Sequence, residues 1–281
     1  MRSCQTTQNN GETLPIIGME VYSGDNDKKL REPLYIYIYI YIYIIPAVGN
    51  ALRQAICDGL VEREDIHVTS NLCSSDHHDP VSSLHQTLHA LASEFKGWRD
   101  YPVPREEDFE TLDMENTWSG MEKCLEMGLC KSIGVSNFPS RKIEELIDFV
   151  CVTPVVNQVE MHPMWRQRKL RSICGDYGIH VSAYSPLGGP GNAWGTTSVL
   201  DHPIIQSIAC KRNATPLSVI LKSFNRRRMK ENTRALDLTL GDWGLREIEK
   251  MEERKIMRAE YLVNDTTSPF KTIQELWDEE I

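Results

Sequence analysis

The stretch between residues 131 and 191 most constrains how this chain can fold. It contains three short and nearly continuous apolar runs, at 132–137, 155–160 and 180–184. Two segments with helical periodicity separate them, at 141–150 and 168–177. Strands that alternate with helices at this spacing are typical of a parallel sheet that is buried on both faces. The stretch therefore predicts an α/β fold.

Polar residues stand at the end of each predicted strand. They are Ser136 and Asn137 for the first strand, Gln158 and Glu160 for the second, and Tyr184 and Ser185 for the third. In a parallel α/β barrel the carboxyl ends of the strands form the active face. We therefore expect these side chains to contribute to one ligand site.

Composition limits the classes of partner and compartment. The chain has 281 residues, a net charge of −9 and no basic stripe, which argues against a nucleic-acid partner. The 8 cysteines form no CxxC pair, and this argues for a reducing compartment and against a zinc site. The first 15 residues lack the apolar core of a signal peptide and the Arg-rich bias of a transit peptide. These features predict a cytosolic protein that is not bound to a membrane and holds no metal.

The segment 34–45 reads LYIYIYIYIYII and is of low complexity. Strict alternation of Tyr and Ile has period 2 and favours a β-strand with one aromatic and one aliphatic face. The run is too short to span a bilayer, which takes roughly 20 residues. An in-frame TA dinucleotide repeat also encodes alternating Tyr and Ile, so translation of non-coding sequence is the origin we favour.

The rest of the chain carries further helix and strand patterns. Helices are predicted at 48–60, 79–91, 115–127, 201–211 and 245–255, and strands within 63–72 and at 217–221. Asp201 and Pro203 are the expected start of one of these helices. The segment 95–113 has no strand signal, although a regular βα repeat would place a strand there.

Several linked motifs in one order resemble the aldo–keto reductases, and most closely their plant cytosolic branch. They are GVSNF (134–138), NQVEMHP (157–163), AYSPLGGPG (183–191), KSFN with RMKEN (222–232), and the tail VNDTTSPF with LWDEEI. The resemblance covers most of the chain outside 20–46 and 93–104. It implies a single (β/α)8 barrel domain over 1–281, with 34–45 as an insertion. It also implies a monomer that reduces small-molecule aldehydes and ketones with NADPH.

The resemblance assigns the cofactor site residue by residue. At the nicotinamide end it implies Ser136, Asn137 and Gln158 on the carboxamide and Tyr184 stacked on the ring. The implied phosphate contacts are Ser185 and Leu187 on the pyrophosphate and Lys222, Ser223 and Arg228 on the 2′-phosphate. The implied adenine contacts are Glu231 and Asn232, and Trp194 is a candidate for the substrate pocket.

The catalytic half of the family pattern is disrupted. Family members use an Asp, a Tyr, a Lys and a His, of which the Asp and Tyr are expected near 35–46, where the Tyr/Ile run stands. The Lys position matches Asn71, and the strand expected to carry the His is replaced by GWRDYPVP. A helix expected after Thr215 and Pro216 is also missing from the sequence pattern. We therefore expect an incomplete barrel that lacks or replaces two strands and one helix, and no assignable catalytic residue.

Three functions stay open at this point. The chain could be an active carbonyl reductase, a non-catalytic NADPH binder or inert relic, or an interaction subunit built on a reductase-like barrel. The loss of the proton-delivering residues favours the second, because hydride transfer without a proton donor leaves an unstabilised oxyanion.

Overall fold

The computed structural model describes residues 5–7, 9–11, 13–15, 19–21, 37–40, 45–72, 76–92, 113–192, 194–223, 238–263, 268 and 270–281. The chain divides into two compact units. The first unit comprises residues 1–12, 134–148 and 153–281, and the second comprises 13–133 and 149–152. Each unit is described separately below.

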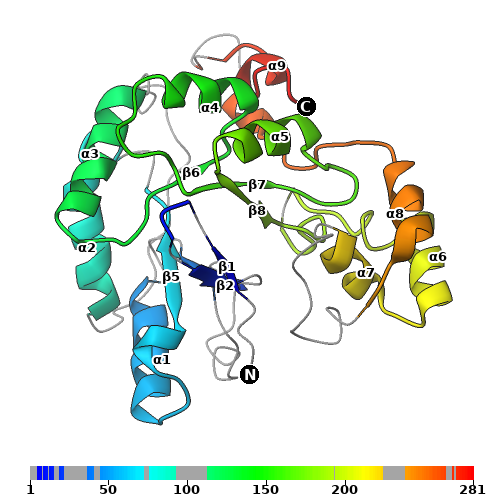
Figure 1. The fold of residues 1–281 in the computed structure, drawn as a ribbon, viewed down its shortest axis with the longest axis horizontal. Coiled ribbons are helices and arrows are strands. Elements are labelled where there is room, and N and C mark those ends of the chain that lie inside the picture. Colours follow the sequence, from blue (N-terminus) through cyan, green and yellow to red (C-terminus); the bar gives the residue numbers. More distant parts are fainter. Residues whose placement is uncertain are drawn as a thin grey trace. The chain divides into compact units, whose positions relative to one another are not determined.

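A parallel sheet of three strands organises the first unit (Figure 1). The strands are β6 (Val135–Ser136), β7 (Val156–Glu160) and β8 (His180–Tyr184), with β7 in the middle. All three lie within the runs that the sequence predicted as strands, and their parallel pairing is confirmed. The short strand β1 (Gln5–Thr7) also belongs to this unit.

Two helices lie on one side of this sheet, α4 (Ser140–Ile147) and α5 (Arg168–Asp176) (Figure 1). The core between helices and sheet contains Ile143 of α4, Val159 of β7, and Leu170 and Cys174 of α5, each almost fully buried. These are the positions that the helical and strand periods place on facing surfaces. The amphipathic pattern therefore fixes which face of each helix covers the strands.

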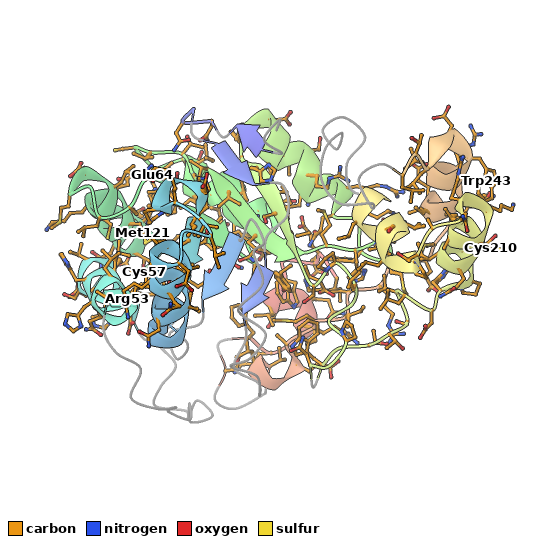
Figure 2. The ribbon with its side chains drawn as sticks, turned by 90° about the horizontal axis from the view of Figure 1, so that it is seen from below. Arg53, Cys57, Glu64, Met121, Cys210 and Trp243 are labelled. Atoms are coloured by element: carbon orange, nitrogen blue, oxygen red, sulfur yellow. The ribbon has the colours of Figure 1, made fainter. Side chains whose placement is uncertain are left out.

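A second core of the first unit forms among α6 (Pro203–Arg212), α7 (Pro216–Ser223) and α8 (Gly241–Glu249). Ile205, Ile208, Val219 and Ile220 are completely buried in it. Figure 2 labels Trp243 of α8 and Cys210 of the neighbouring helix α6. The ammonium of Lys211 lies 4.0 Å from the Trp243 ring centroid. The C-terminal part adds the 3₁₀ helix η4 (Glu260–Leu262) and α9 (Ile273–Leu276).

The prediction of a strand at 217–221 was wrong, because this segment belongs to helix α7. The Thr215 hydroxyl accepts a hydrogen bond from the Ser218 backbone N–H at 3.2 Å, and Pro216 stands at the first helical position. Val219 and Ile220 are buried while Leu217 is exposed, as on a one-sided helix. The helix expected after Pro216 is therefore present, contrary to the prediction from the sequence pattern.

Two helix boundaries also differ from the prediction. Helix α8 begins at Gly241 and ends at Glu249, whereas a helix over 245–255 was expected. In α6 the side chain that caps the helix belongs to His202, which accepts from the Ile204 N–H at 3.3 Å, and not to Asp201. Pro203 occupies the first turn as predicted.

The second unit contains another parallel sheet, with the order β3 (Met19–Val21), β4 (Tyr37–Ile40) and β5 (His67–Ser70). The period-2 argument for the Tyr/Ile run is confirmed over β4, which pairs with both neighbours. Strand β2 (Thr13–Pro15) and the 3₁₀ helix η1 (Arg63–Asp65) also belong to this unit. The turn and strand predicted within 63–72 are confirmed.

Three helices complete the second unit: α1 (Ile45–Cys57), α2 (Pro80–Ala92) and α3 (Met114–Glu126). Helices α1 and α2 pack so closely that a Cβ on Gly49 would lie 2.0 Å from the Leu91 carbonyl oxygen. Arg53, labelled in Figure 2, donates to that same carbonyl at 2.6 Å. Within the described part of the chain, no helix has the length and apolarity needed to cross a membrane.

Candidate functional site

The candidate site lies at the carboxyl ends of β6, β7 and β8. The strand register aligns Ser136 with Gln158, and Gln158 with Ser182 on the third strand. It also aligns Glu160 with Tyr184. The polar residues that the sequence placed at three separate strand ends therefore meet at one edge of one sheet, as expected from parallel strands.

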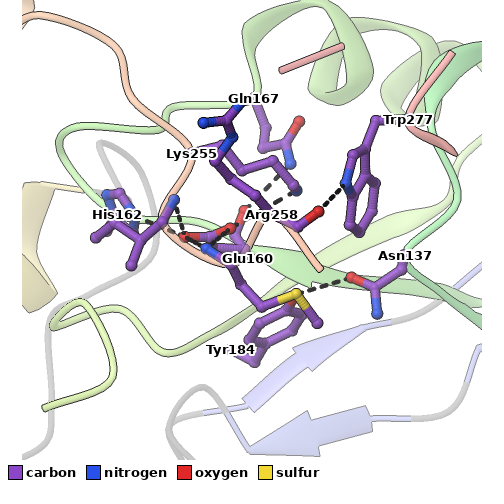
Figure 3. A network of polar contacts seen from close by, with 10 residues as sticks. Asn137, Glu160, His162, Gln167, Tyr184, Lys255, Arg258 and Trp277 are labelled. Carbon is purple, nitrogen blue, oxygen red and sulfur yellow. Dashed lines mark hydrogen bonds and ion pairs between the residues drawn. The ribbon is translucent and has the colours of Figure 1, made fainter. Parts of the chain in front are cut away.

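Asn137 directly follows β6, an outer strand of this sheet, and links it to both other strands. Its backbone adopts the left-handed conformation with φ of 58°, which Asn tolerates better than most residues. Its N–H donates to the Gln158 carbonyl at 2.9 Å, and its Oδ1 accepts from the Tyr184 hydroxyl at 2.9 Å (Figure 3). The second bond fixes the orientation of the amide group, with its oxygen directed at the tyrosine.

The neighbouring polar groups are held just as firmly. The Ser136 hydroxyl donates to the Gln158 carbonyl at 3.0 Å, and Gln158 itself is buried. The Asn157 side-chain amide donates to the Phe138 carbonyl at 2.9 Å, which ties the turn after β6 back to β7. Four of the predicted cofactor residues are thus brought together by one hydrogen-bonded framework: Ser136, Asn137, Gln158 and Tyr184.

A buried charged cluster lies directly beside this framework (Figure 3). The Glu160 carboxylate accepts from His162 Nε2 at 3.0 Å and from the backbone N–H groups of Ile256 and Met257. Lys255 Nζ lies 3.6 Å from the other Glu160 oxygen and 3.6 Å from the Trp277 ring centroid. This cluster joins the end of β7 to the C-terminal segment of the same unit.

The environment changes the acidity of both charged groups. Burial alone would raise the pKa of Glu160, but the hydrogen bond from His162 and the charge of Lys255 hold that pKa below its ordinary value. Burial lowers the pKa of Lys255, and the attraction of Glu160 opposes this shift. Each group therefore shifts the pKa of the other toward its charged form, against the effect of burial.

His162 is completely buried and hydrogen-bonded to Glu160, so it serves packing and hydrogen bonding in this cluster. Sequence reasoning missed Lys255, because it assigned that residue to the helix predicted over 245–255. The one available signal was Glu160 itself, since a carboxylate inside a buried strand needs a cationic or hydrogen-bonding partner. Nothing in the local pattern indicates which residue supplies it.

The loop after β8 contains three further candidate residues. Ser185 has a φ of 47°, and its carbonyl accepts from the Gly188 N–H at 2.9 Å in a tight turn. Leu187 packs partly buried against the second core of the first unit. The Trp194 side chain is 39% exposed and lies so close to Gly189 that a Cβ there would be 2.6 Å from the indole. The absence of a side chain at Gly189 therefore leaves room for the Trp194 indole beside the loop.

The residues predicted at the adenosine end stay predictions. Lys222 and Ser223 form the last turn of α7, and the structure describes only their backbone. Arg228, Glu231 and Asn232 lie outside the described residues. The four residues predicted at the nicotinamide end come together, and the position of 222–232 relative to them stays a prediction.

The positions expected to carry catalysis lie in the second unit. Asn71, at the family's lysine position, directly follows β5, and β4 of the Tyr/Ile run occupies the middle of that sheet. The segment 93–112, where the histidine strand was expected, lies outside the described residues. Among the residues that the structure does describe, no group of three metal-binding side chains occurs.

Comparison with known proteins supports the family resemblance that the sequence motifs indicated. The sequence model of the Aldo/keto reductase family matches residues 78–196. Deoxymugineic acid synthase 1 of Zea mays is 40% identical, with 83% of each chain covered. The (1S)-1,7-diacetoxy-luvungin A aldo-keto reductase of Citrus sinensis is 38% identical, covering 83% of this chain and 81% of its own length. Aldo-keto reductase family 4 member C11 of Arabidopsis thaliana is 34% identical, with coverages of 83% and 82%. At this identity over most of both chains, the protein belongs to the aldo/keto reductase family.

Proposed function

We propose that this protein binds NADPH at the carboxyl ends of β6, β7 and β8 and that its reduction of small-molecule carbonyl compounds is strongly impaired. The nicotinamide carboxamide contacts Ser136, Asn137 and Gln158, and the ring stacks on Tyr184. The pyrophosphate contacts Ser185 and Leu187, and Lys222, Ser223, Arg228, Glu231 and Asn232 hold the adenosine 2′-phosphate and base. Trp194 borders the substrate pocket.

The observation that carries the binding half is the hydrogen bond from the Tyr184 hydroxyl to Asn137 Oδ1 at 2.9 Å. It holds an amide group and an aromatic ring in fixed relation at a strand edge where a nicotinamide needs both. Hydrogen bonds to the carboxamide determine which face of the ring offers its hydride. An always-charged guanidinium at Arg228 and an ammonium at Lys222 suit the 2′-phosphate.

The catalytic half of the proposal rests on Asn71. An amide at the lysine position supplies no positive charge to lower the pKa of a proton-donating tyrosine. General acid catalysis typically contributes about 10²- to 10⁴-fold, and stabilisation of the developing oxyanion contributes about 10²- to 10³-fold per donor. Loss of both makes carbonyl reduction slower by several orders of magnitude even when NADPH is bound.

The wider proposal follows from the family. The two parallel sheets are parts of one (β/α)8 barrel over residues 1–281, incomplete where the Tyr/Ile run and the segment 93–104 replace family sequence. The protein acts in the cytosol as a monomer. An active reductase of small carbonyl compounds is the alternative function. It is favoured by the relatives from Citrus sinensis and Arabidopsis thaliana, which are named as aldo-keto reductases.

A titration with NADPH tests the binding site. Asn137→Gly removes the amide but keeps the backbone, because a φ of 58° suits glycine. Asn213→Gly is the matched control, since Asn213 also has a positive φ, of 48°, but caps the end of α6. We expect wild type and the control to quench NADPH-sensitive tryptophan fluorescence alike, and Asn137→Gly to bind about tenfold more weakly, as for loss of one good hydrogen bond. Equal affinity in all three variants would place the cofactor elsewhere.

A further inference from the structure

The turn between β6 and α4 lacks a local cap. Helix α4 begins at Ser140, and its N-cap residue is Pro139, which makes no side-chain hydrogen bond to the helix. The first N–H groups of a helix need an acceptor, and a proline side chain cannot provide one. Asn137, a residue of the candidate site, stands three residues before this helix start and in a left-handed conformation. Its position depends on how firmly the helix start is held.

The missing acceptor comes from the C-terminus of the chain. Glu280 Oε2 accepts a hydrogen bond from the Ser140 N–H at 3.1 Å. Its other carboxylate oxygen lies 2.9 Å from the Lys169 ammonium on α5, and that contact raises the pKa of Lys169. A carboxylate at a helix N-terminus is also favoured by the positive end of the helix dipole. Glu280 therefore replaces the cap that Pro139 cannot form.

Adjacent residues give the same C-terminal segment further contacts with the unit. Asp278 forms an ion pair with Lys142 of α4 at 3.0 Å. Trp277 is buried and its indole N–H donates to the Arg258 carbonyl at 2.9 Å. One small cavity is lined by Asn137, Pro139, Trp277 and Glu280 together, so the C-terminal segment and the candidate site share a wall.

We infer that Glu280 is a positioning residue for the nicotinamide end of the dinucleotide site. By capping α4, Glu280 fixes the turn that carries Asn137. The Asn137 side chain is therefore already in place when the nicotinamide carboxamide binds. This inference rests on the proposed function, because it assumes that a nicotinamide dinucleotide binds at Asn137. It adds the C-terminal segment to the parts of the chain that determine affinity for the cofactor.

The test compares two ligands on the full chain. NADPH reaches the Asn137 turn, whereas adenosine 2′,5′-bisphosphate lacks the nicotinamide. Glu280→Ala is expected to weaken NADPH binding by about fivefold to tenfold, the usual effect of losing a helix cap, and to leave the bisphosphate unchanged. Glu280→Gln is expected to restore most of the affinity, because its side-chain oxygen can still accept from Ser140. Glu279→Ala, at an exposed neighbouring position, is expected to match wild type for both ligands.

Two further variants separate positioning from general loosening. Asp278→Ala removes another anchor of the same segment and leaves the cap on Ser140, so it is expected to lower the melting temperature without selective loss of NADPH. If Glu280→Ala shows no cooperative melting and so does not fold, Lys169→Ala replaces it, because it removes only the ion pair with Glu280. Lys169→Ala is expected to weaken NADPH binding selectively by about twofold, as for an exposed ion pair.

Equal weakening of both ligands by Glu280→Ala, or of NADPH by Asp278→Ala, would overturn the inference. So would unchanged NADPH affinity in Lys169→Ala. If wild type binds neither ligand, the proposed function fails and the inference fails with it. If wild type binds both ligands but Glu280→Ala equals Glu279→Ala, only the inference fails.

Discussion

The geometry of the candidate site depends on how its side chains are oriented more than on which residue types it contains. The Tyr184 hydroxyl and the Asn137 amide are common groups, and their value lies in the hydrogen bond that fixes both. Sequence patterns predicted their meeting, because both follow strands of one parallel sheet. The patterns could not predict that Lys255 and Trp277 would also come to this edge, since no local period encodes contacts between distant segments.

Removing the tyrosine hydroxyl tests that bond. Tyr184→Phe keeps the stacking ring but leaves the Asn137 amide without its donor, so NADPH affinity should fall by about threefold to tenfold, as for a loss of about 1 kcal/mol. Fluorescence titration measures this change. Tyr177→Phe, at a tyrosine that is 41% exposed, is the control and should bind like wild type. A fall of the same size in both variants would mean that the hydroxyl of Tyr184 has no special role.

The buried pair predicts a large effect on stability. Lys255→Met leaves the Glu160 charge buried with no cation 3.6 Å away, and breaking such a pair from one side typically costs about 3–5 kcal/mol. Urea unfolding followed by circular dichroism measures the loss. Lys250→Met, at a lysine whose side chain is 64% exposed, should leave the midpoint nearly unchanged. The double variant Glu160→Gln with Lys255→Met should recover part of the loss, and a double variant as unstable as the sum of the single ones would refute the coupling.

The stability of the protein at low pH should reveal how much the Glu160 charge contributes to the free energy of unfolding. Its pKa in the folded protein lies below the ordinary value of 4.5, so its charge stabilises the fold above about pH 4.5 and this stability is lost as the pH falls through the folded pKa. One such group contributes a slope of at most about 1.4 kcal/mol per pH unit. Urea midpoints measured from pH 7 downward should therefore fall less steeply in Glu160→Gln than in wild type. Parallel profiles would contradict the assignment.

At the scale of elements, capping chemistry decided the main disagreement between sequence and structure. The run from Leu217 to Leu221 is apolar and contains a β-branched pair, Val219 and Ile220, and so it reads as a strand. Thr215 and Pro216 before it form a helix start, and that local signal prevailed. Short apolar runs are compatible with both strand and helix, and here the capping residues before the run determine that it is helical.

Removal of this cap should weaken α7. Thr215→Ala loses the acceptor for the Ser218 N–H and should cost about 1 kcal/mol. Thermal unfolding measures the change, with Thr197→Ala at an exposed loop position as the control. A melting temperature equal to that of the control would show that Thr215 does not determine the helix.

The strand β4 is the opposite case, in which a simple pattern was sufficient. Alternating Tyr and Ile has no helical period, no Gly and no Pro, and its predicted strand lies between β3 and β5. The pattern could not predict the register, in which Tyr37 faces His67 and Ile40 faces Ser70. Any even shift of a two-residue repeat presents the same faces, so register here depends on the neighbouring strands.

At the scale of the whole molecule, we propose that this chain keeps family membership but has lost most of the family's catalytic activity. The relatives share 34–40% identity over 83% of this chain, and the family model matches 78–196, the range that contains the four residues proposed for the nicotinamide end. Asn71 and the Tyr/Ile run stand where the family's proton-delivering groups are expected. The sequence predicts this contrast because motifs are local, but it could not predict that Glu280 accepts a hydrogen bond from the start of α4.

Rapid mixing of the NADPH-loaded protein with a small aromatic aldehyde tests the central claim most directly, because one fluorescence trace reports binding and turnover together. The account predicts a bound-cofactor signal that forms on adding NADPH and then persists after the aldehyde is added, with oxidation no faster than in buffer. Absence of the bound signal, or its decay at the rate shown by the Arabidopsis thaliana relative in the same assay, would contradict it.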